Sequence, residues 1–97
     1  SQERLKKVIK IDEQLSFLEQ SVKENVINQM HKAIKKGIIP GAVVIFDGEE
    51  TDKHIVTSLI LGHDNKIEAR LMDENGGSYM HWPANSKRLT VVKFYNE

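Results

Sequence analysis

Apolar residues recur every three or four positions over much of the first 36 residues. From position 15 onward they are Leu15, Leu18, Val22, Val26, Ile27, Met30, Ala33 and Ile34. This spacing places their side chains on one face of an α-helix. Lys35 and Lys36 follow, where cations stabilise the negative end of a helix dipole. Because Gly37 suits a left-handed cap and Pro40 cannot continue the helix, we predict that it ends at Lys36.

The start of this helix has two candidates. Asp12 can act as the N-cap residue, or Ser16 can form a capping box with Glu19 three positions later. We favour Asp12. Residues 3–11 continue the helical spacing, yet their β-branched side chains also suit an edge strand, and of these two interpretations we favour a helix.

After Pro40 the pattern changes to short apolar or alternating runs. Gly, Asn, Asp and Pro residues separate these runs and supply the backbone angles of turns. Consecutive runs are therefore expected to pair as antiparallel strands. The five predicted strands are residues 42–47, 54–62, 66–73, 78–82 and 89–95.

Two of these strands, the first and the second, are apolar on both faces. Such strands need cover on both sides, which a helix packed on a small barrel would provide. With a long first connection at 47–53, a tight turn at 75–77 and Pro83 before the last strand, the arrangement resembles an SH3-like barrel. We therefore expect an α+β single domain spanning residues 1–97. In it, a helical segment (residues 1–39, with a short helix or edge strand at its start) packs on a five-stranded antiparallel barrel (residues 40–97).

Composition limits the function classes. The chain has 97 residues, 39% of them apolar, and no cysteine, which fits one small core and excludes disulfide scaffolds and thiolate chemistry. Its longest apolar runs, 42–46 and 59–61, are far shorter than the roughly 20 residues of a membrane span. No secretory signal pattern is present at the start. We therefore expect a cytoplasmic protein without a membrane partner.

The residues that could carry chemistry form no recognisable catalytic or metal-binding motif. None of the four histidines has a second histidine at the spacing of a helical metal site. Ser58 and Ser78 lack the glycines of a nucleophile elbow. We therefore predict no cofactor and no enzymatic activity, and an enzyme with an unrecognised site is the third hypothesis.

The first hypothesis is a non-enzymatic binding or regulatory module that acts through protein contacts, either with another protein or as a homodimer. Phe17 lies off the helical stripe beside Leu18, and an exposed aromatic there would be an interface anchor. The alternative is that Phe17 covers the connection to residues 3–11. Glu49, Glu50 and Asp52 give the first barrel connection an acidic surface for a basic partner.

The second hypothesis is a barrel that binds single-stranded or non-specific nucleic acid. Small barrels bind single strands by stacking bases on exposed aromatic residues beside basic ones. The candidate residues are Arg70, Tyr79, His81, Lys87 and Arg88. The chain has 14 basic and 14 acidic residues, so it lacks the strong positive field of non-specific DNA binders.

Overall fold

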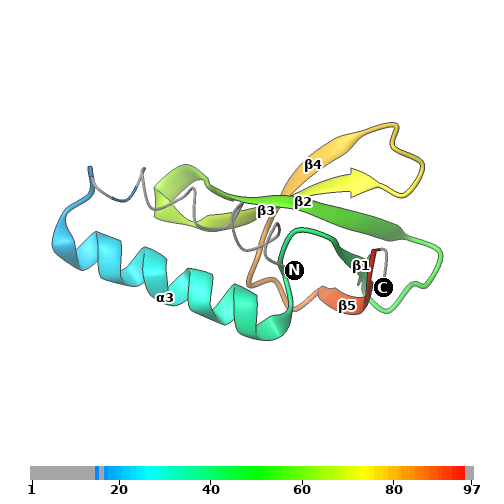
Figure 1. Ribbon diagram of the computed structural model, residues 1–97, viewed down its shortest axis with the longest axis horizontal. Coiled ribbons are helices and arrows are strands. Elements are labelled where there is room, and N and C mark those ends of the chain that lie inside the picture. The colour runs from blue at the N-terminus through cyan, green and yellow to red at the C-terminus, as the bar shows by residue number, and fades with distance from the viewer. Residues whose placement is uncertain (1–14, 16, 96–97) are drawn as a thin grey trace.

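A computed structural model describes residue 15 and residues 17–95, which form one helix packed on a five-stranded antiparallel sheet (Figure 1). Each strand begins and ends within one residue of its prediction, and the α+β class is confirmed. The elements are α3 (Gln20–Lys36), β1 (Ala42–Phe46), β2 (Lys53–Leu61), the short 3₁₀ helix η1 (His63–Asn65), β3 (Ile67–Asp73), β4 (Tyr79–Pro83) and β5 (Leu89–Phe94).

The sheet has the strand order β4-β3-β2-β1-β5. The prediction that all consecutive strands pair is wrong for the last pair, because β5 lies beside β1 rather than β4. Strands β1 and β5 pair from Ala42 opposite Phe94 to Phe46 opposite Leu89. Just beyond this ladder, the Asp47 N–H donates to the Arg88 carbonyl at 2.9 Å. Over the described residues the sheet is therefore open, with β4 and β5 as its edges, and a closed SH3-like barrel is not confirmed.

The end of α3 follows the prediction, but its start does not. Gly37 caps the helix with a left-handed φ of 90°, as expected. The helix begins at Gln20 instead of following Asp12, after a turn in which the Leu18 N–H donates to the Leu15 carbonyl. This turn keeps Leu15 buried and Leu18 packed against the core, so burial alone does not require a continuous helix. Asp12, Ser16 and residues 3–11 lie outside the described residues.

The core lies between α3 and one face of the sheet, here called the inner face. Val26 and Met30 of α3 are buried in one cluster with Val44 of β1, Val56 of β2 and Leu71 of β3. In Figure 1, α3 runs along the hairpin of β2 and β3. Among the described residues, no helix combines the length and the apolar character that a membrane crossing requires.

The opposite, outer face of the sheet is buried in part. Val43 and Ile55 are cross-strand partners and so share a face. Both are buried, as is Ile45, although their neighbour Val44 belongs to the inner-face cluster. All five residues of β1 are buried, which confirms the predicted two-sided cover of this strand. On β2 the cover is less complete, because Ser58 and Ile60 are half-buried.

A side-chain amide joins the helix to the sheet. Gln29 of α3 donates from Nε2 to the Asn65 carbonyl at 2.9 Å and accepts at Oε1 from the Ile67 N–H at 2.9 Å. Both bonds are partly buried. Gln29 thus satisfies two backbone groups where the chain passes from η1 into β3, and it fixes the position of α3 along the hairpin.

Candidate functional site

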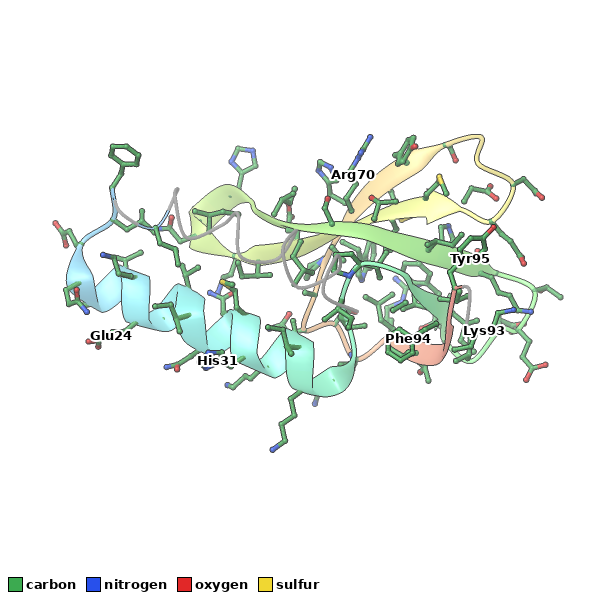
Figure 2. The ribbon with its side chains drawn as sticks, viewed as in Figure 1. Glu24, His31, Arg70, Lys93, Phe94 and Tyr95 are labelled. Atoms are coloured by element: carbon green, nitrogen blue, oxygen red, sulfur yellow. The ribbon has the colours of Figure 1, made fainter. Side chains whose placement is uncertain are left out.

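Three of the residues proposed to contact nucleic acid lie together on the outer face of β3 and β4. Arg70 is the cross-strand partner of His81, and Tyr79 lies two positions from His81 on the same face. The Arg70 guanidinium carbon lies 3.9 Å from the centre of the Tyr79 ring, a cation–π contact. Figure 2 shows Arg70 pointing away from α3. Tyr79 keeps 52% of its surface exposed, so the stack is accessible to a partner.

Arg88 does not lie with Arg70, Tyr79 and His81. Its Nε and Nη2 donate to the two carboxylate oxygens of Asp47, with the shortest bond at 2.7 Å. This hydrogen bonding lowers the pKa of Asp47 and raises that of Arg88. The charge of Arg88 is therefore compensated. Lys87 is exposed in the connection before Arg88, so the five predicted residues do not form one nucleic-acid surface.

Trp82 lies on the inner face, opposite to Tyr79 and His81, as the alternation along the strand requires. Its ring meets Phe46 of β1 edge to face, with 5.3 Å between the ring centres. The guanidinium of Arg88 lies 5.1 Å from the Trp82 ring centre. The curved sheet thus brings a side chain from edge strand β4 onto β1, although β4 and β5 are not hydrogen-bonded to each other.

The residues predicted to bind protein occupy two separate places. Phe17 is 89% exposed, and the connection to residues 3–11 that it was expected to cover in the alternative lies outside the described residues. Leu18 beside it packs partly against the core. Glu49, Glu50 and Asp52 are exposed in the connection between β1 and β2. That connection and the start of α3 lie at opposite ends of the molecule, whose long axis measures 41 Å (Figure 1).

Strand β4 forms an open edge of the described sheet, a feature that the sequence analysis did not identify. Two backbone bonds define how it pairs with β3: the Ala84 N–H donates to Ile67 at 3.0 Å, and the Asp73 N–H donates to Ser78 at 2.9 Å. In an antiparallel pair, alternate residues point their backbone groups toward the partner strand. Positions 78, 80, 82 and 84 therefore face β3. Tyr79 and His81 direct their N–H and C=O groups outward, away from the sheet.

The side chains along this edge are exposed on both faces. Tyr79 lies on the outer face, whereas Met80, the partner of buried Leu71, lies on the inner face and is 40% exposed. Pro83 has no N–H and ends the stretch that can pair. We call Tyr79, Met80 and His81 the β4 edge. The sequence predicts this strand and the turn before it, but only the observed strand order shows that no described strand covers its outer edge.

Among the described residues, no three His, Asp or Glu side chains are grouped so that they could hold a metal ion. Comparisons of the chain with protein-family models, curated proteins and solved structures find no match. The functional argument therefore depends on the surface of the protein itself, and above all on the β4 edge.

Proposed function

We propose that the protein is a small non-enzymatic binding module that contacts other proteins through the β4 edge. The observation that carries this proposal is the pair of outward backbone N–H groups at Tyr79 and His81, on an edge with exposed apolar side chains on both faces. Extended segments of partner proteins add to such edges as an extra strand. Their backbone provides affinity, and alternate side chains provide specificity.

The side chains at this edge favour a protein partner. Tyr, Met and Arg are enriched at protein interfaces, and Tyr79, Met80 and Arg70 occur together here. The stack of Arg70 on Tyr79 orders both side chains before a partner arrives, which lowers the entropy cost of binding. An SH3-like barrel, the finer form of the predicted fold, is also a frequent scaffold for binding sites and remains part of this proposal.

A His81→Pro variant tests the proposed function. The outward N–H of His81 does not bond to β3, so its removal should leave the fold intact while it removes a donor for the partner. Tagged wild-type and variant protein are used to capture partners from the native host, and each captured partner is then purified and titrated. We expect the variant to lose about tenfold or more in affinity, since a donor and the strand geometry are both lost.

Phe17→Ala is the matched control, because it removes a different large exposed aromatic residue without touching β4. Circular dichroism and the fluorescence of the single tryptophan, Trp82, verify that each variant is folded. If every captured partner binds wild type and His81→Pro equally well, the proposed function is wrong. If Phe17→Ala alone abolishes binding, the interface lies at the start of α3 instead.

Nucleic-acid binding is a second candidate because Arg70, Tyr79 and His81 share one exposed face. Asp73 and Glu74 follow on the same hairpin and would repel phosphate, so we expect weaker binding than in a dedicated nucleic-acid protein. A labelled single-stranded oligonucleotide at low salt tests this function. Binding that falls with added salt and is lost in Arg70→Ala would support it, and absence of binding at low salt would exclude it.

A further inference from the structure

We infer that one partner of the β4 edge is a second copy of this chain, paired antiparallel to the first about a two-fold axis at Met80. This inference rests on the proposed function, because it names an occupant for the same edge. The other sheet edge is less available. The register of β5 against β1 shifts near Val92, and β5 carries the charge of Lys93; both features oppose pairing with an added strand. Strand β4 instead pairs with β3 in regular register and is exposed from Tyr79 to His81.

The backbone selects this register. Only outward-facing residues can bond to an added strand, and within the β4 edge these are Tyr79 and His81. An axis at Met80 places Tyr79 of each copy opposite His81 of the other. Each of these pairs then exchanges two N–H to C=O bonds, so every outward donor and acceptor of both residues is used. An axis at His81 would instead place Tyr79 opposite Pro83, which has no N–H to donate. An axis at Tyr79 would place His81 opposite Gly77, which lies in the turn before β4 and not in the strand.

The side chains agree with the same register. Residues directly opposite each other share a face of the sheet, so Met80 would pack against Met80 of the second copy on the inner face. On the outer face, the exposed ring of Tyr79 would lie beside the imidazole of His81 from the second copy, next to Arg70. The pairing therefore covers both apolar side chains that the single chain leaves exposed at this edge, Tyr79 and Met80.

The charges at the two ends of β4 are complementary. Glu74 is exposed in the turn before the strand, and Lys87 is exposed in the connection after it. Antiparallel pairing brings the start of one β4 next to the end of the other, so Glu74 of each copy faces the end that carries Lys87 of its partner. Opposite charges at both ends favour this antiparallel arrangement over a parallel one, which would place like charges together.

Single cysteine substitutions test the register directly, because the chain has no cysteine of its own. Opposed residues that are not hydrogen-bonded to each other lie about 4.5 Å apart at Cα, which a disulfide can bridge. In Met80→Cys the two thiols would face each other. In Tyr79→Cys or His81→Cys the identical positions are offset by two residues and lie roughly 8 Å apart, beyond the reach of a disulfide.

We therefore expect Met80→Cys to form a covalent dimer under mild oxidation at least about tenfold faster than either neighbouring variant. Circular dichroism confirms that all three variants are folded, and non-reducing gels follow the reaction. Equal rates at the three positions, or the fastest reaction at position 79 or 81, would overturn the register.

Charge variants at the same position test the two-fold axis without oxidation. Wild type should associate reversibly in sedimentation experiments between about 10 µM and about 1 mM, a range suited to a small interface. Met80→Lys and Met80→Glu should each be monomeric, because like charges would meet on the axis. An equal mixture of the two should restore dimers, a result that a different interface would not give.

A wild-type protein that remains monomeric up to about 1 mM would overturn this inference, as would a mixture of the charge variants that fails to associate. The proposed function is tested independently of the dimer. It is tested by the capture experiment with His81→Pro, which depends on other proteins and not on self-association. A monomeric protein whose partner binding is lost in His81→Pro would disprove the dimer and retain the binding module.

Discussion

Gln29 provides the sharpest test of how the helix is fixed to the sheet. Replacing it with Met keeps the length of the side chain and nearly the same helix propensity, while it removes both bonds to the strand connection. It also removes the 2.8 Å bond from Gln29 Nε2 to Asn25, which is exposed and contributes little. The variant therefore isolates two partly buried hydrogen bonds, to the Asn65 carbonyl and from the Ile67 N–H.

The expected loss follows from the number of bonds. A hydrogen bond contributes about 1 kcal/mol net, so the free energy of unfolding should fall by about 2 kcal/mol. With a urea dependence of about 2 kcal/mol per M for a domain of this size, the midpoint should shift down by about 1 M. The melting temperature should fall by roughly 8–16 °C. Urea unfolding followed by the fluorescence of Trp82 measures this change.

Gln20→Met is the matched control. It makes the same substitution on the same helix, but Gln20 is exposed and bonds only to the Glu24 side chain one turn away. We expect it to change stability by less than about 0.5 kcal/mol. If Gln29→Met were as stable as Gln20→Met, the two backbone bonds of Gln29 would not position the helix, and apolar packing alone would hold it.

Three further substitutions test the core, the helix cap and the surface ion pair. Leu71→Ala should cost about 3 kcal/mol in thermal or chemical unfolding, because it opens a cavity at a fully buried site; a loss below about 1 kcal/mol would contradict the packing. Gly37→Ala should cost about 1 kcal/mol, because its φ of 90° strains any L side chain, whereas Gly77→Ala, with open space and no positive φ, should be nearly neutral. The hydrogen bond from Arg88 lowers the pKa of Asp47, so the stabilisation by this pair is present above the ordinary carboxyl pKa and is lost as the pH falls through the lowered one. Wild type should therefore unfold at a higher urea concentration than Asp47→Asn at neutral pH, and the two midpoints should converge in acid; a constant difference would refute the assignment.

The sequence was sufficient to predict what depends on neighbours along the chain. Short apolar or alternating runs between turn residues located all five strands, and Gly37 located the end of the helix. The sequence did not locate the start of α3. The apolar spacing is compatible both with a helix that continues through Phe17 and with one that turns there, because Leu15 and Leu18 contact the core in the observed turn.

The candidate sites depended on contacts between distant residues, which local patterns do not reveal. Arg88 was grouped with Arg70 because both are basic, yet it pairs with Asp47, 41 positions away. Gln29 went unnoticed for the same reason, since its partners are 36 and 38 positions away. By contrast, the position of Tyr79 and His81 on a face opposite to Trp82 follows from the alternation along one strand, because that relation is local.

The two sheet edges differ in a way that supports a function for β4. Proteins protect edge strands from unwanted pairing with bulges and charged side chains. Strand β5 carries both, an irregular register against β1 near Val92 and the charge of Lys93. Strand β4 pairs with β3 in regular register and carries Pro83 only at its end. The open stretch from Tyr79 to His81 thus has neither device, yet it is too short to pair indiscriminately, because Pro83 and the turn at Gly76 limit it on both sides. An edge that can pair over only three residues, because a turn and a proline limit it, suits a partner strand of defined register.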